Sequence, residues 1–175
     1  MGVIRLRKAS GLVIVTCLGL SGCLSGFKHP LGSVEEAFIE AGLVGRWECV
    51  AEDAPPGVIT ILDFDGKQYY IQVESEKEEP GQFRAYATRI EEVAFLNFRA
   101  IGPKADDEWT FLAYELQDAD HLSFRYVDPQ PFEDVIDDGP SVSARLGSLL
   151  QDPEVLHDYL SCTRADPAAT GAGQP

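Results

Sequence analysis

Apolar and polar residues alternate in short runs between Gly45 and Val127, and turn residues separate these runs about every ten positions. Alternation with a period of two predicts β-strands, because successive side chains of a strand point to opposite faces. One boundary, Asp65-Gly66, is a pair typical of a β-hairpin turn. The pattern predicts a mainly β fold whose antiparallel strands follow one another as a meander, in a barrel or a sandwich. The predicted strands are Gly45–Val50, Gly57–Phe64, Gln68–Glu74, Phe83–Ile90, Val93–Ala100, Glu108–Leu116 and His121–Val127.

The fifth and sixth of these strands are apolar on both faces. Phe95 and Leu96 are neighbours in the chain and therefore point to opposite faces, and so do Phe111 and Leu112. A sheet with one face in water alternates cleanly between apolar and polar positions. We therefore expect something to cover the outer face of these two strands, either helices of this chain or a protein partner.

A short helix is predicted before the first strand. Ser33–Glu36 matches a capping box, with Ser33 as the N-cap and Glu36 three residues later. The apolar residues that follow continue the helix as far as Ala41, and Gly42 ends it.

Two short helices are predicted late in the chain, and they are the candidate cover for the two-sided strands. The first is Phe132–Asp137, and the second is 153–160, where Asp152 and Pro153 form a helix start and the apolar residues lie on one stripe. Ser141–Leu146 is expected to be a brief strand, and Ser161–Arg164 is expected to be a strand that closes the sheet.

Composition and charge narrow the class of protein. The 175 residues fit one domain, and an apolar content of 45% argues against a disordered chain. The formal net charge of −15 argues against nucleic-acid binding, which needs basic residues facing the phosphates.

The N-terminus has the features of an export signal. Basic residues near the start precede an apolar run, Gly11–Leu20, which is too short for a stable membrane span; a single-pass anchor is the alternative. The run ends in Leu20-Ser21-Gly22-Cys23, which resembles the lipobox of bacterial lipoproteins. The resemblance implies cleavage before Cys23, a diacylglycerol thioether on Cys23 and an acylated amine, and hence the bacterial cell envelope. Leu24, in place of Asp, suggests the outer membrane.

These features divide the chain into a signal peptide (1–22), a lipidated tether (23–31), a β-barrel domain (32–165) and a disordered tail (166–175) that lacks core-forming residues. Loss of the signal peptide removes three basic residues and no acid, so the net charge changes from −15 to −18. An acidic domain of this kind is repelled by anionic lipid, and the attached lipid must hold it at the membrane.

The cysteines allow one disulfide. Cys17 leaves with the signal peptide and Cys23 carries lipid, so Cys49 and Cys162 remain in an oxidising compartment. The prediction is a Cys49–Cys162 disulfide, and the alternative is two buried free thiols.

Gly45-Arg46-Trp47, on the first predicted strand after a short helix, resembles the Gly-x-Trp motif of lipocalins. The resemblance implies a lipocalin-like barrel whose base is closed by Trp47 and whose interior holds a small ligand. Two features depart from the family: the Thr-Asp-Tyr turn is absent, and two late helices replace a single one.

Candidate chemistry is sparse. No nucleophile, phosphate-loop or metal motif is present, and none of His29, His121 and His157 has a catalytic neighbourhood in the sequence, so no catalytic, metal or cofactor site is predicted. Asp63-Phe64-Asp65-Gly66 resembles the start of a calcium loop, but the predicted strand that follows favours a tight type I′ turn. Four arginines lie on predicted strands and are expected to face outward, although inward-facing ones could bind a carboxylate or a phosphate; they are Arg84, Arg89, Arg99 and Arg125.

The function predicted from the sequence is a lipid-anchored, non-catalytic binding module for a small apolar or amphipathic ligand. The alternative is a structural or adaptor lipoprotein that presents an acidic surface to an envelope protein complex. An enzyme is the third and least supported hypothesis.

Overall fold

The computed structural model of the chain describes residues 26–51, 54–76, 78–102, 105, 107–135 and 137–166. The predicted signal peptide, the predicted lipidation site Cys23 and most of the predicted tail lie outside these ranges.

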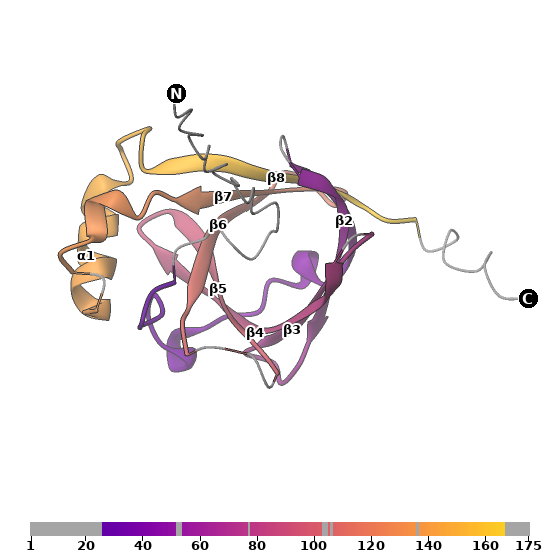
Figure 1. The fold of residues 1–175 in the computed structure, drawn as a ribbon, viewed down its shortest axis with the longest axis horizontal. Coiled ribbons are helices and arrows are strands. Elements are labelled where there is room, and N and C mark those ends of the chain that lie inside the picture. The colour runs from indigo at the N-terminus through magenta and orange to yellow at the C-terminus, as the bar shows by residue number, and fades with distance from the viewer. Residues whose placement is uncertain are drawn as a thin grey trace, which may run out of the picture.

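Eight strands form one closed sheet in which each strand pairs antiparallel with the next and β8 returns to pair with β1 (Figure 1). The mainly β fold and the antiparallel meander barrel are therefore confirmed. Among the strands that the structure describes, closure leaves none with an unpaired edge. The strands are β1 (Gly45–Ala51), β2 (Ala54–Asp63), β3 (Tyr69–Ser75), β4 (Glu78–Ile90), β5 (Val93–Ala100), β6 (Thr110–Leu116), β7 (His121–Val127) and β8 (Leu156–Arg164).

The barrel has two ends. We call the end with the β2–β3, β4–β5 and β6–β7 turns the base. The end with the β1–β2, β3–β4, β5–β6 and β7–β8 connections is called the loop end.

The turns differ from the predictions in two places. β4 begins at Glu78 and not at the predicted Phe83, so residues 78–82 are strand as well. The β2–β3 turn spans five residues rather than two, because β2 ends at Asp63 and β3 begins at Tyr69. The Asp63 and Asp65 side chains accept backbone N–H groups of this turn at 2.8–3.0 Å, so the two aspartates stabilise the turn itself.

The predicted helix at 153–160 is wrong, because residues 156–164 form β8. β8 carries a bulge: Phe124 pairs with Leu160 and Arg125 pairs with Asp158, so the register shifts by one residue at Tyr159. A bulge adds one residue and breaks the period of two. The apolar residues around it therefore imitate the spacing of a helix, and pairing with both β1 and β7 decides the conformation.

The other predicted helices are also displaced. Ser141–Leu146, expected to be a strand, lies in helix α1 (Gly139–Leu149). Asp138 is the N-cap residue of α1, and its carboxylate accepts a hydrogen bond from the Ser141 hydroxyl at 2.6 Å. The helix expected at 132–137 is a 3-10 turn, η3 (Gln130–Phe132). Before β1, two 3-10 turns replace the single predicted helix, and they are η1 (Val34–Glu36), with the expected capping box, and η2 (Ala41–Leu43).

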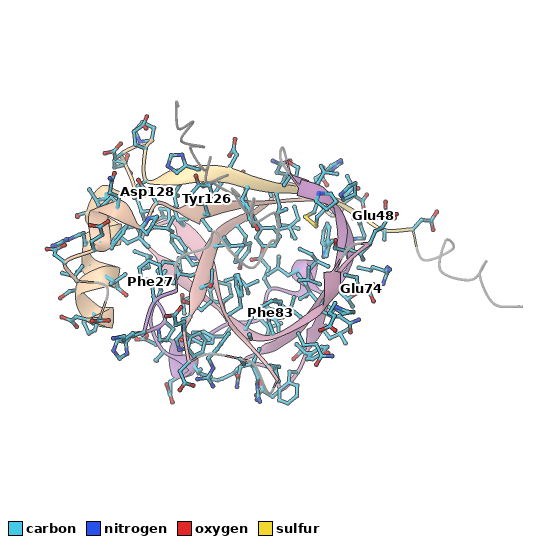
Figure 2. The ribbon with its side chains drawn as sticks, viewed as in Figure 1. Phe27, Glu48, Glu74, Phe83, Tyr126 and Asp128 are labelled. Atoms are coloured by element: carbon cyan, nitrogen blue, oxygen red, sulfur yellow. A yellow bond between two sulfur atoms is a disulfide. The ribbon has the colours of Figure 1, made fainter. Side chains whose placement is uncertain are left out.

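The outer face of β5 and β6 is covered, as the two-sided strands predict. Phe95 and Phe111 point outward into a buried cluster with Phe27, Phe132 and Leu146. The cover is thus the N-terminal segment together with η3 and α1, and not a helix at 153–160. In Figure 2, Phe27 lies on the α1 side of the barrel.

The segment that contains Phe27, expected to belong to a tether at 23–31, is fixed to the barrel in its described part. Phe27 and Trp109 exchange two backbone hydrogen bonds of 2.7 Å, as neighbouring strands do. Leu31 is fully buried, and its N–H donates to Asn97 Oδ1 at 2.7 Å while its carbonyl accepts the Thr88 hydroxyl at 2.9 Å. Burial of the Phe27 and Leu31 side chains stabilises this docking by about 1.5–3 kcal/mol each.

The disulfide prediction is confirmed. Cys49 and Cys162 are directly paired residues of β1 and β8, and their sulfurs are bonded across the seam that closes the barrel. The bond therefore joins the first and last strands of the sheet, 113 residues apart.

We expect a double Cys49→Ala, Cys162→Ala variant to fold but to lose about 5 kcal/mol of unfolding free energy, because a cross-link over so long a loop restricts the unfolded chain. Urea denaturation measures the loss, and reduced wild-type protein is the control that should match it. A change below about 1 kcal/mol in both samples would contradict this role of the seam.

We predict that ionisation of the Tyr86 phenol lowers the unfolding free energy of the protein at alkaline pH. Burial, and after it the charge of Glu35, raises the pKa of Tyr86 from 10.0 to about 12, and the phenol donates to the Gly32 carbonyl at 3.3 Å. Because the pKa is raised in the folded state, this contribution is complete below about pH 10 and is lost as the pH rises to about 12. Between about pH 10 and about pH 12, the unfolding free energy of the wild type should therefore fall by roughly 2 kcal/mol more than that of Tyr86→Phe. Urea denaturation from about pH 9 to about pH 12 measures both; equal falls would refute the assignment.

Candidate functional site

The base of the barrel is closed by a tryptophan and an arginine. Trp47 is fully buried, and its indole N–H donates to the Leu43 carbonyl at 2.9 Å. The Arg164 guanidinium lies 4.2 Å from the centre of the Trp47 ring and donates to the carbonyls of Gly42, Val44 and Ala119 at 2.7–3.1 Å. Ligand entry through the base would require these contacts to break.

Gly45 permits this closure. Its φ of +149° lies in the region that favours glycine, and a Cβ at this position would meet the Arg164 guanidinium. Gly45 and Trp47, the glycine and the tryptophan of the predicted motif, are thus both needed for the packing of Arg164 on the Trp47 ring.

A polar cluster made by Glu40, Tyr69 and Tyr114 lies in the part of the interior next to the base. The Tyr114 hydroxyl donates to the Glu40 carboxylate at 2.8 Å, and the Tyr69 hydroxyl accepts the Glu40 backbone N–H at 2.7 Å. Burial raises the pKa of Tyr114, and its hydrogen bond to Glu40 and the charge of Glu40 raise it further; burial likewise raises the pKa of Tyr69. Both phenols therefore stay protonated, and the cluster stabilises the interior instead of supplying a general base.

The remaining interior is occupied by apolar side chains of the barrel itself. Inward-facing residues of all eight strands form one buried cluster, with Ile61, Leu96, Leu112 and Leu122 among its members. Towards the loop end the interior residues are half-buried and aromatic. Phe83 packs edge-on against Phe98 at 5.5 Å, and Tyr126 stacks on His157 at 5.0 Å and contacts Tyr159 edge-on at 6.2 Å.

A groove of about 770 Å³ lies on the outside of the barrel. It crosses β3, β2, β1, β8 and β7, and residues of the Gln117–His121 turn form one end of it. Its walls carry the outward-facing side chains of each strand, and Gly57 and the two half-cystines lie at the same level of the sheet. The outward-facing lining residues include Glu48, Val50, Val58, Glu74, Ser161 and Thr163.

The groove combines carboxylates with an exposed apolar side chain. Glu48 is exposed, Glu74 is half-buried, and Val50 has 54% of its surface in water. One cation compensates Glu74, since Arg46 Nη2 lies 3.3 Å from its carboxylate. At the other end, His121 Nδ1 lies 2.9 Å from Asp118, and hydrogen bonds from the Asp120 N–H and the His121 side chain lower the pKa of Asp118. The volume of the groove falls in the range of ligand sites, and its charge favours a cationic occupant.

Of the residues singled out from the sequence, the structure joins Cys49 and Cys162 and places the three histidines apart from one another. Cys49 and Cys162 lie beside the groove, whereas Cys23 is outside the described residues. His29 and His157 lie away from the groove, and only His121 lines it.

Three of the four strand arginines, Arg84, Arg99 and Arg125, face outward as expected, whereas Arg89 pairs with Ala94 and lies on the interior face of β4, at its base end. The guanidinium groups of Arg84 and Arg99 stack on aromatic rings of the outer surface, at 4.0 Å from the centre of Phe64 and at 5.1 Å from the centre of Trp109. Arg84 and Arg99 are therefore part of the outer surface, and the exposed Arg89 donates to the Glu92 carbonyl at 3.1 Å in the β4–β5 turn.

Sequence reasoning missed the groove. Its residues come from five strands and one turn, and none of them carries a motif. The only local signal is the outward-facing acid and valine of β1, which alternate with Trp47 and Cys49.

Within the described ranges, no three His, Cys, Asp or Glu side chains are grouped as metal ligands require. None of the helices in the part of the chain that the structure describes has the length and apolar character of a bilayer span.

No family model matches the chain, and neither a curated protein nor a solved structure matches it.

Proposed function

We propose that the chain is a lipid-anchored protein of the bacterial cell envelope, without catalytic activity, that binds a basic segment of a partner protein in the groove on the outside of its barrel. This is the adaptor alternative of the sequence analysis, and the observation that carries it is the contrast between a packed interior and an open acidic groove.

The packed interior argues against the lipocalin type of ligand binding implied by Gly45-Arg46-Trp47. A ligand inside the barrel needs a cavity, whereas the interior positions here hold large side chains, among them the fully buried Trp47, Tyr69 and Ile61. To admit a ligand, these side chains would have to move and expose apolar surface, at a cost of about 25 cal/mol for each Å².

The groove has the properties of a protein-binding surface. It offers an exposed valine for apolar contact and carboxylates on two strands, Glu48 and Glu74, for charge pairing. The net charge of −18 expected after signal cleavage favours fast association with a basic partner.

A second candidate function is supported by the half-buried aromatic residues of the loop end. Two aromatic pairs, Phe83 with Phe98 and Tyr126 with Tyr159, pack against the interior cluster, and part of an amphipathic molecule could lie against them. Saturable displacement of a fluorescent fatty acid from delipidated protein, lost in Tyr126→Ala, would favour this function over the adaptor.

The anchor predicts the behaviour of a Cys23→Ser variant. A hydroxyl cannot form the thioether, and an acidic domain has no attraction of its own for anionic lipid. We expect the variant to move from the membrane fraction to the soluble fraction, as measured by fractionation and intact mass. Cys17→Ser, which alters the signal peptide only, is the control and should remain in the membrane fraction. A Cys23→Ser protein that still partitions with membranes at unchanged mass would refute the anchor.

The groove predicts a charge-dependent contact. A photo-crosslinking amino acid at Val50, inside the groove, should give a discrete product with an envelope protein in cells, and the same probe at Leu62, which is 47% exposed outside the groove, should not. Glu48→Lys should reduce the Val50 product severalfold, because it reverses a charge that faces the basic partner.

The matched control for this experiment is Glu92→Lys, which makes the same charge change at an exposed position in the β4–β5 turn. It should leave the Val50 product unchanged. Equal losses in the two variants would mean that net charge alone acts, and the groove proposal would then be rejected.

A further inference from the structure

The described N-terminal segment fixes where the chain leaves the barrel on its way to Cys23. Phe27 has 3% of its surface exposed, and its ring lies 4.2 Å from the centre of Phe111 and 6.3 Å from the centre of Phe132. Its backbone is paired with Trp109, directly before β6 begins at the loop end. A Cβ added to Gly26 would meet the Glu108 side chain, so the chain still lies against the loop end at Gly26.

This docking resists detachment because it includes buried polar contacts. Asn97 is fully buried, accepts the Leu31 N–H and donates to Thr88 Oγ1 at 2.9 Å, while Thr88 donates to the Leu31 carbonyl. Pulling Leu31 away would leave Asn97 Oδ1 without its donor and the Thr88 hydroxyl without its acceptor. The docked segment therefore stays on the barrel and does not lengthen the chain that connects the barrel to Cys23.

The remaining chain is short. Only Leu24 and Ser25 separate Cys23 from Gly26, and three extended residues span at most about 11 Å. If Cys23 carries lipid, its backbone lies at the headgroup layer of the membrane. Gly26, and with it the loop end, must then lie within about 11 Å of that layer.

We propose that the loop end of the barrel is held against the lipid surface by the short chain between Cys23 and Phe27, so that the barrel has one orientation on the membrane. This inference rests on the proposed lipid anchor and adds the surface that faces the membrane. The lipid layer that holds the acyl chains of Cys23 is the single partner of this surface.

The position of the docked segment decides whether the groove is accessible. Glu48 and Glu74 lie on the side of the barrel opposite to Phe27 and α1 (Figure 2). The N-terminal segment that leads to Cys23 therefore does not cover the groove, and a partner protein has access to it. The acidic loop-end residues that face lipid, Asp107 and Glu108, supply no attraction, so the covalent tether alone sets the orientation.

Two exposed apolar positions of nearly equal exposure test the orientation. Ile101, directly after β5 at the loop end, is 44% exposed, and Leu62, one residue before the end of β2 at the base, is 47% exposed. Each is replaced by cysteine in the lipidated full chain and labelled with a thiol-specific fluorophore, and mass spectrometry verifies that Cys49–Cys162 is intact. The protein is then reconstituted in vesicles that contain a quencher attached to lipid headgroups.

We expect quenching at Ile101→Cys to exceed quenching at Leu62→Cys severalfold. Insertion of a flexible Gly/Ser linker of about twelve residues between Ser25 and Gly26 should remove the difference, since such a linker spans roughly 20 Å on average and lets the barrel rotate.

Each other outcome overturns a definite statement. Equal quenching at the two positions of a lipidated chain would overturn the inference and leave the anchor standing. A difference that survives the linker would mean that the loop end binds lipid through its own surface, and the short tether would be rejected. Absence of lipid on Cys23 by mass spectrometry would overturn the proposed anchor, and the inference with it.

Discussion

The pairing of β1 with β8 is the contact on which the rest of this structure depends. Without it the sheet would be an open meander with two unpaired edges, and its interior would lie open to water along one side. The pairing puts Cys49 beside Cys162 and Trp47 beside Arg164. One seam thus carries the covalent cross-link, the closure of the base and the floor of the acidic groove, so that changes at the seam affect all three together.

A second constraint comes from the two-sided strands β5 and β6. Their outward-facing phenylalanines must be buried, and the chain buries them with its own N-terminal segment and with η3 and α1. The N-terminal segment therefore has two roles, since the residues that complete the outer core are also those nearest to the proposed lipid. A flexible tether would leave the barrel free to rotate above the membrane. A docked segment gives it a defined orientation instead.

Taken together, the packed interior, the outer groove and the docked segment favour a protein that works through its surface. Side chains occupy the interior from the Trp47 closure to the aromatic residues near the loop end. The acidic groove lies on the side opposite to the membrane-proximal segment in the proposed arrangement. An eight-stranded barrel is then a rigid support that holds carboxylates from separate strands in fixed positions, with the disulfide beneath them.

The sequence by itself determined the meander, the limits of β5 and β7, the need for an outer cover and the one possible disulfide. These properties follow from alternation over a few residues and from the small number of cysteines, so they can be seen without knowledge of distant contacts. The bulge at Tyr159 made β8 resemble a helix, and only its pairing with two neighbouring strands decided its conformation. The docking of Phe27 and the groove were also decided by the tertiary structure. Both are formed by residues that are far apart in the chain, and a local pattern contains no information about which strands lie side by side.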